Sequence, residues 1–300
     1  MRRWLIVTLA LLPVGCGPLA NFSSNPDGPH TLAISEHKEG DVYRVTWVRT
    51  SETDGMAASS GHRGKGGKEE TKEKIVFTEE VLEKPAGAKR PTRLRRTYEV
   101  VDKSRSGTAV KSHLVGKTAE VEWADDKPKF KVDGQPPTAE QKKELEREFG
   151  NTRSKTTTTA DMLPGKPVKV GETWPVDRES FVEGMTDTPG VTFDTAHCRI
   201  TGKLVKVTNV GGKLQAAVEF TMRVPVSDIE IPGVGGFRAD DASRMTVTAT
   251  VEFCLDGSTP GEWTAYNGQG RVGADLPRNG LITVHYTEAG TIREEPVTKK

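Results

Sequence analysis

The stretch KLQAAVEFTMRVPV, residues 213–226, decides the fold, because every even position in it from 214 to 226 is apolar. Successive side chains of a β-strand point to opposite faces, so this alternation predicts a long strand with one buried face. Gly211 and Gly212 precede it and predict a two-residue hairpin loop to a strand over residues 197–210. The apolar phase of that partner changes after Leu204, which predicts a β-bulge near Gly202.

The same alternation extends outward along the chain. It predicts further strands at residues 42–50, 74–83, 94–101, 108–115, 118–123, 129–132, 245–255, 262–269 and 281–287. Short turns join most of them, so neighbours in sequence are expected to be antiparallel neighbours in space. The predicted fold is therefore all-β and mainly antiparallel, a curved sheet or half-barrel with two β-rich halves at residues 41–160 and 161–300.

One helix is predicted, at residues 138–149. Thr138 and Gln141 form a capping box at its start, and Gly150 supplies its C-terminal stop. Leu145 and Phe149 give it a narrow apolar stripe, which is typical of a helix that lies on a sheet.

The N-terminus predicts export. Arg2 and Arg3 precede an apolar run over residues 4–14, which is shorter than the roughly 20 residues that a spanning helix needs. Residues 1–15 are therefore predicted to be a signal peptide, and the polar residues 16–40 a flexible tether. An ordinary secretory signal, cleaved between residues 15 and 20, is the alternative to a lipid-modified one.

Two segments resemble known families. Residues 12–16, LPVGC, resemble a lipoprotein signal, although Pro13 stands where leucine is usual. This resemblance implies lipidation at Cys16 and a membrane-anchored protein of the bacterial cell envelope, where Gly17 allows outer-membrane residence. Residues 166–174, KPVKVGETW, look like a segment of uncharacterised bacterial lipoproteins. That likeness implies a curved antiparallel sheet similar to the half-barrel of the lipoprotein-carrier superfamily, and no known activity.

Composition and motifs exclude several classes of function. Lys+Arg number 43 against 42 Asp+Glu, which argues against a nucleic-acid partner, and the mean hydropathy of −0.54 excludes a polytopic membrane protein. Metalloprotease, nucleophile-elbow and phosphate-loop motifs are missing from the sequence, so no enzyme and no cofactor is predicted. Strand parity places Cys198 on an apolar face and Cys254 on a polar face, so two thiols and no metal site are expected.

Two segments of biased composition have alternative interpretations. Residues 51–72 are rich in glycine and charge, and we expect a mobile hairpin tip there rather than an RNA-binding repeat. Residues 89–96 hold a basic cluster that either meets anionic phosphates or pairs with Glu79, Glu80 and Glu83 across a hairpin. We prefer the hairpin pairing.

The predicted binding site is apolar. We expect one face of the curved sheet to form a concave surface, covered in part by the helix at residues 138–149. If this groove is open, it holds a lipid-like ligand such as an acyl chain or a lipoprotein tail. If its own side chains fill it, the protein is a scaffold or protein-interaction module of the envelope. The lining residues are Ile200, Leu204, Leu214, Val218, Phe220, Met222, Val247, Val251 and Phe253.

Overall fold

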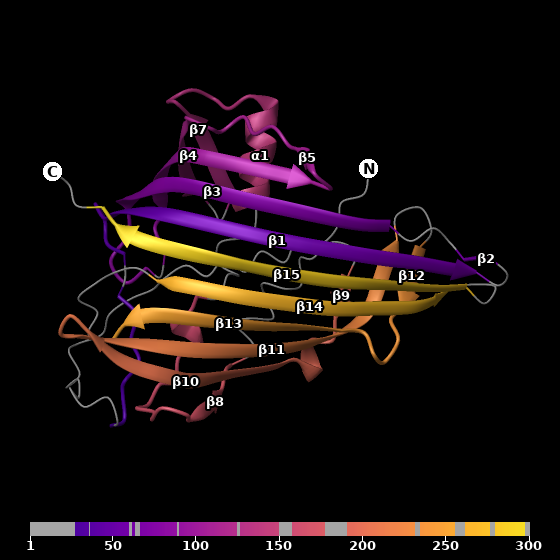
Figure 1. The fold of residues 1–300 in the computed structure, drawn as a ribbon. Helices are drawn as coiled ribbons and strands as arrows, with labels where there is room; N and C mark the ends of the chain where they lie inside the picture. The colour runs from indigo at the N-terminus through magenta and orange to yellow at the C-terminus, as the bar shows by residue number, and fades with distance from the viewer. Residues whose placement is uncertain are drawn as a thin grey trace.

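A computed structural model describes residues 28–35, 37–59, 62–63, 67–88, 90–124, 127–149, 158–177, 191–231, 235–255, 262–276 and 280–297. These residues form a large antiparallel sheet whose strands run across the whole molecule (Figure 1). The predicted all-β class is therefore confirmed.

The strands follow an order in which sequence neighbours are mostly neighbours in space. Their order is β7 (Lys127–Val132), β6 (Thr118–Ala124), β4 (Arg93–Arg105), β3 (Gly67–Glu83), β1 (Val42–Ser59), β15 (Gly280–Pro296), β14 (Trp263–Leu276), β13 (Arg244–Cys254), β11 (Lys213–Ile231), β10 (Arg199–Val210) and β8 (Thr173–Pro175). Four short strands branch from this path: β2 (His62–Arg63), β5 (Thr108–Ala109), β9 (Val191–Phe193) and β12 (Gly235–Arg238).

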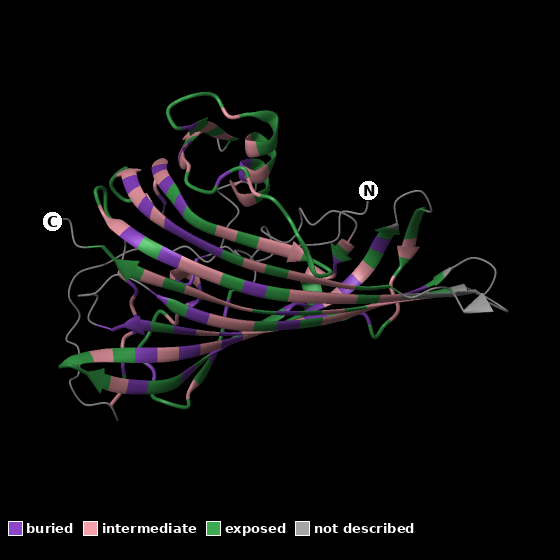
Figure 2. Ribbon diagram, turned by 45° about the horizontal axis from the view of Figure 1, so that its top comes forward, coloured by how far each residue is buried: buried purple, intermediate pink, exposed green. Residues whose placement is uncertain are grey.

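The two predicted halves share this one sheet. The first long strand, β1, pairs with the last, β15, from Tyr43 opposite Pro296 to Ala58 opposite Leu281. Each half nevertheless has its own core: residues 43–149 supply most of one, and residues 32–34 with 162–282 supply the other. Figure 2 shows the curvature of the sheet between these two ends.

Both cores lie on the same face of the sheet, which we call the inner face. A single row of paired residues crosses it from one half to the other, and its character changes from apolar to charged on the way. The row is Gly202, Phe220, Ala249, Tyr266, Gly290, Arg49, Glu73 and Lys103.

The hairpin that decides the fold is confirmed. β10 and β11 pair from Val210 opposite Lys213, and the two loop glycines have positive φ angles of 60° and 86°. The bulge lies between Leu204 and Lys206, three residues after the predicted place. The extra residue is therefore Val205, which is exposed. Leu204 and Val207, the nearest residues of β10 on the apolar face, are buried.

The helix α1 (Ala139–Phe149) forms as predicted, with reciprocal hydrogen bonds between Thr138 and Gln141 at its start. Its position differs from the prediction. Leu145 is fully buried in the core of residues 43–149, so α1 covers the N-terminal half rather than the predicted groove. Six residues separate β7 from α1, which keeps the helix near this end of the sheet, and the ion pair between Glu148 and Arg96 on β4 holds it there.

The flexible tether is wrong for residues 28–35 and for His37. Leu32 and Ile34 are 5% and 3% exposed and belong to the core of the C-terminal half, and His30 pairs with Val168 through two backbone hydrogen bonds. Leu32 and Ile34 are buried and alternate with the less buried Thr31, Ala33 and Ser35, which is the pattern of a packed extended segment. Residues 1–27, including Cys16, lie outside the described residues.

Two other predicted boundaries are wrong. The glycine-rich stretch at 51–72 is strand up to Ser59 and again from Gly67, because β15 runs alongside β1 and supplies backbone partners that composition does not reveal. The strand expected over 108–115 shrinks to β5, and Val110 and Val115 beyond it are exposed.

Candidate functional site

The predicted groove residues gather on the inner face, where they form a filled core. Seven of them are between 0% and 4% exposed, and Leu214 and Val247 pack against these as partly buried side chains. The seven are Ile200, Leu204, Val218, Phe220, Met222, Val251 and Phe253. The side chains that bury them come from this chain itself, namely Leu32, Ile34, Met162, Val168, Trp174 and Phe193.

Trp174 of the KPVKVGETW segment closes this core. Its ring lies against Gly202, where an added Cβ would stand 2.3 Å from a ring carbon. The indole Nε1 donates a hydrogen bond of 2.9 Å to the carbonyl of Met162, and the ring meets Phe220 edge-on. The tryptophan is therefore a structural anchor of this core.

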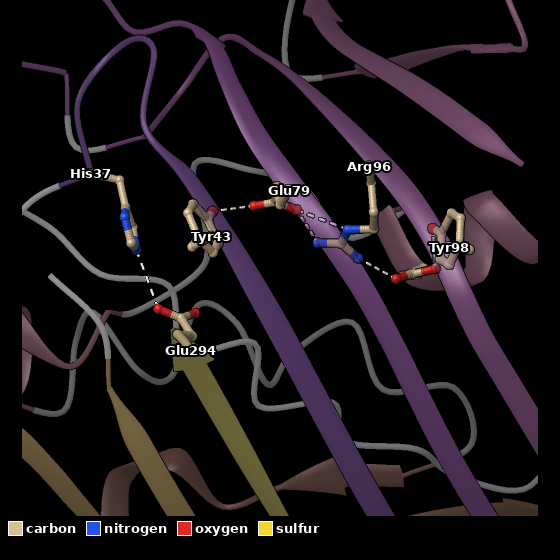
Figure 3. A network of polar contacts seen from close by, with 7 residues as sticks. His37, Tyr43, Glu79, Arg96, Tyr98 and Glu294 are labelled. Atoms are coloured by element: carbon tan, nitrogen blue, oxygen red, sulfur yellow. Dashed lines mark hydrogen bonds and ion pairs between the residues drawn. The ribbon is translucent and has the colours of Figure 1, made fainter. Parts of the chain in front are cut away.

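A buried polar chain runs through the core of the N-terminal half, and Figure 3 shows it from close by. We use this name for seven side chains: His37, Tyr43, Glu79, Arg96, Tyr98, Glu148 and Glu294. They come from the N-terminal segment, β1, β3, β4, α1 and β15.

Arg96 is the centre of this chain. Its guanidinium forms ion pairs with Glu79 on β3 and Glu148 on α1, and all three side chains are at most 15% exposed. The Arg96 Cζ also stands 3.7 Å from the ring centroid of Phe77 and 4.7 Å from that of Phe149. One cation thus joins two strands and the helix inside the protein.

Two tyrosines complete the hydrogen bonding of these carboxylates. The Tyr43 hydroxyl donates to Glu79, and the Tyr98 hydroxyl donates to Glu148 at 2.8 Å. Burial, followed by the charge of the adjacent glutamate, raises the pKa of both tyrosines well above the usual value. Both hydroxyls therefore stay protonated and serve as donors.

At the other end, His37 joins the N-terminal segment to β15. Its Nε2 lies 3.2 Å from Glu294, and its ring stacks on Tyr43 with centroids 4.0 Å apart. Burial, and then the charge of Glu294, raises the pKa of the nearby Glu262 to about 8. This pKa makes Glu262 a neutral, buried acid at pH 7, even though the hydrogen bond that it accepts from Thr159 opposes the shift.

A small cavity of about 230 Å³ opens beside His37. It lies where β1 begins and β15 ends, and its lining residues are His37, Gly40, Asp41, Val42, Tyr43, Pro296 and Val297. Within the described part of the chain, His37 Nδ1 is buried without a hydrogen-bond partner. The volume admits a few waters or a small polar molecule, and it is below the range typical of sites for drug-sized ligands.

A second charged cluster occupies the middle of the inner face. Arg49 Nε lies 3.6 Å from Glu288 and 3.8 Å from Glu73, which is also 3.8 Å from Lys103 Nζ. All four side chains are at most 12% exposed, and their formal charges cancel. These contacts are longer than hydrogen bonds, so the cluster is held less tightly than the buried polar chain.

The basic cluster on β4 pairs across the sheet, as predicted. Arg95 contacts Glu80 at 3.1 Å and Glu120 at 2.9 Å, and Arg93 also contacts Glu120. Lys89 lies outside the described residues. These arginines are therefore neutralised by neighbouring strands.

Cys198 and Cys254 are thiols, as predicted, and both are buried. Cys254 pairs with Gln215 on the outer face of the sheet, as strand parity predicts, but it is only 7% exposed there, and Leu255 after it is 1% exposed. Alternation stops there because β13 ends at Cys254 and the chain leaves the sheet. In the described ranges no group of three His, Cys, Asp or Glu side chains is arranged to hold a metal ion. The helices seen there are all too short or too polar to cross a membrane.

Comparison with known proteins adds little. No family model matches the chain, and neither does any curated protein. A structure of lipovitellin, solved in a study of its lipid–protein interactions, aligns with 88% of this chain at 10% sequence identity and a TM-score of 0.36. The aligned part is only 26% of the lipovitellin chain. An outer membrane channel from Pseudomonas putida F1 is also 10% identical over 87% of this chain and 97% of the channel, with a TM-score of 0.21. The fold defines the structural class, an all-β protein with a curved antiparallel sheet. The comparisons assign no family to it.

The predicted pairing of Arg96 with Glu79 across the hairpin is confirmed, but the sequence did not reveal the rest of the buried polar chain. Its members are far apart in sequence, with 257 positions between His37 and Glu294. One signal was present: Glu79 and Arg96 stand at inward positions of strands whose other inward residues are apolar, such as Phe77 and Leu94. A charged residue at such a position indicates a buried ion pair.

Proposed function

We propose that this protein is an exported, lipid-anchored component of the bacterial cell envelope with a structural, non-catalytic role, as a scaffold or protein-interaction module. The signal-like residues 1–15 and the lipidation motif at Cys16 support export and anchoring. The observation that carries the structural role is the filled inner face of the C-terminal half, where seven of nine predicted groove residues are buried by the chain itself.

A filled face argues against a lipid carrier. Sites for lipid-sized ligands enclose several hundred cubic ångströms lined by apolar side chains. Here Met162, Val168 and Trp174 occupy the space over β10 and β11. An acyl chain would have to displace these side chains and re-expose the sheet, which costs about 25 cal/mol for each Å² of apolar surface.

The buried polar chain supports a rigid module. It fixes α1, four strands and the N-terminal segment to one another through Arg96 and His37. Buried ion pairs of this kind specify one arrangement of the elements more than they add stability. A scaffold needs such a fixed shape, and the segment that follows the anchor is part of it.

A lipid-like ligand remains the second candidate, at a different place. Between the two cores the inner face carries partly exposed aromatic side chains, Trp47, Tyr266 and Tyr286. Partly exposed aromatic rings on a concave face favour contact with an apolar ligand.

Mass spectrometry of the mature protein tests the anchor. Full-length protein is expressed in a bacterium, and its N-terminal peptide is sequenced and weighed. We expect a peptide that begins at Cys16 and carries a diacylglyceryl group, and we expect the Cys16→Ser variant to lose both this mass and membrane fractionation. Cys198→Ala is the matched control, since it removes a thiol elsewhere and must leave the anchor intact. An unmodified N-terminus between residues 15 and 21 would contradict the proposal.

A further inference from the structure

The described chain begins beside the edge of the sheet formed by β8 and β10. His30 N donates to Val168 O at 2.7 Å, and Val168 N donates back at 2.9 Å, so the fold holds the described chain near its start. Figure 1 shows the first described segment of the chain, drawn in indigo, starting next to β8. Residues 17–30 span at most about 50 Å when fully extended. If Cys16 carries the lipid, as the proposed function holds, this edge lies within that distance of the membrane surface.

The same edge exposes apolar side chains. Val170 is 45% exposed and Val205 is 42% exposed. They are close together because Gly171 N donates to Leu204 O at 2.7 Å and Leu204 N donates to Glu172 O at 3.1 Å. The bulge in β10 turns Val205 outward, because the pairing with β11 passes from Leu204 to Lys206 and skips it. Leu204 and Val207, on either side of the bulge, remain buried.

Lysines surround these two valines. Lys166, Lys169, Lys203 and Lys206 are all exposed and lie on the same two segments. The acidic groups nearby are Glu172, 3.9 Å from Lys166, and Glu219, opposite Lys203 on β11. Four ammonium groups thus face two carboxylates, and the surface has a net positive charge.

We propose that this surface, formed by Lys166, Lys169, Val170, Lys203, Val205 and Lys206, rests on the anionic headgroups of the membrane that holds the lipid anchor. Lysines near an anionic surface are attracted to lipid phosphates, and small apolar side chains enter the boundary between headgroups and acyl chains. The inference depends on the proposed anchor, which fixes the distance between this surface and the bilayer.

The opposite end of the sheet provides a matched control surface. β7 also presents exposed lysines, Lys127, Lys129 and Lys131, but Lys129 and Lys131 lie opposite Glu122 and Glu120 on β6. This edge is the far end of the strand order from β8. It has lysines at similar density, and the anchored segment does not begin beside it.

Lysine acetylation of the mature, lipidated protein tests the proposal. The protein is labelled with an N-hydroxysuccinimide acetate in detergent, in phosphatidylcholine vesicles and in vesicles of phosphatidylcholine and phosphatidylglycerol, and each lysine is quantified by mass spectrometry. We expect the labelling of Lys203 and Lys206 to fall about fivefold in the anionic vesicles relative to detergent, and less in the neutral ones. Labelling of Lys129 and Lys131 is expected to be the same in all three.

Two variants separate the outcomes. Lys203→Glu/Lys206→Glu should restore labelling at Lys166 and Lys169, whereas Lys129→Glu/Lys131→Glu should leave their protection unchanged. Equal labelling of both edges in anionic vesicles, on protein whose Cys16 peptide carries lipid, would overturn the docking surface and leave the anchor standing. Protection in neutral and anionic vesicles alike would overturn the role of the lysines. An unlipidated Cys16 would overturn the proposed function and this inference together.

Discussion

Arg96 is the residue whose loss should disturb the fold most, since its charge is shared by two buried carboxylates. The substitution Arg96→Met keeps the length of the side chain and removes the charge. Glu79 and Glu148, which are 2% and 15% exposed, then lose their cation inside the protein. Removing one partner from a buried ion pair typically costs about 3–5 kcal/mol, because the remaining charge is left uncompensated.

The contacts that survive place the expected cost near the lower end of that range. Tyr43 still donates to Glu79, and Tyr98 still donates to Glu148. Methionine also keeps apolar contact with the rings of Phe77 and Phe149. We therefore expect a loss of about 3 kcal/mol in the free energy of unfolding, which for a protein of this size lowers Tm by about 6–12 °C.

Urea unfolding followed by circular dichroism measures the loss, and Arg95→Met is the matched control. Arg95 is the next residue on β4, with ion pairs to Glu80 and Glu120, but its side chain is 41% exposed. Exposed pairs contribute about 0–1 kcal/mol. If Arg95→Met costs as much as Arg96→Met, or if Arg96→Met costs less than about 1 kcal/mol, the buried polar chain does not organise the fold as argued.

Three further predictions concern stability. Leu32→Ala should lower the free energy of unfolding by about 2–5 kcal/mol because Leu32 is a core residue, whereas Val170→Ala, at an exposed position, should lower it by less than about 0.5 kcal/mol. Equally small effects of both variants in urea unfolding would mean that the segment around Leu32 is a flexible tether after all. Gly202→Ala should lower the free energy of unfolding by about 1–3 kcal/mol, because the added methyl group overpacks against the Trp174 ring. At Gly236 an added Cβ meets nothing within 4 Å, so Gly236→Ala should be nearly neutral in thermal unfolding. Glu262, whose folded pKa of about 8 exceeds the value near 4.5 expected when unfolded, stabilises the fold below about pH 4.5, and this contribution is lost as pH rises through 8. The stability of Glu262→Gln should therefore fall less between pH 5 and 9, and parallel curves for both proteins would refute the buried acid.

Local patterns determine most of the fold and are visible in the sequence. The even-numbered apolar residues of β11 set which face is buried, and the glycines at 211 and 212 set the hairpin that pairs it with β10. The capping box of Thr138 and Gln141 fixes the start of α1 in the same way. These features depend on residues within a few positions of one another, so a sequence predicts them.

Features that depend on distant partners were not predictable. Residues 51–59 are strand because β15, more than 220 positions later, pairs with them, and no local composition reveals that partner. The placement of α1 likewise depends on Arg96 and Glu148, which meet only in the folded protein. The sequence left the groove either open or filled, and two of the side chains that fill it, Leu32 and Ile34, lie in a segment that was assigned to a tether.

Native mass spectrometry of the mature, lipidated protein, released from detergent in the gas phase, tests the central claim most directly. The claim is that the apolar inner face of the C-terminal half is a core filled by its own chain. We expect the mass of the polypeptide from Cys16 plus its covalent anchor, and no further species that dissociates on denaturation. An additional lipid-sized mass that is lost on unfolding would contradict the filled core and make the protein a lipid carrier.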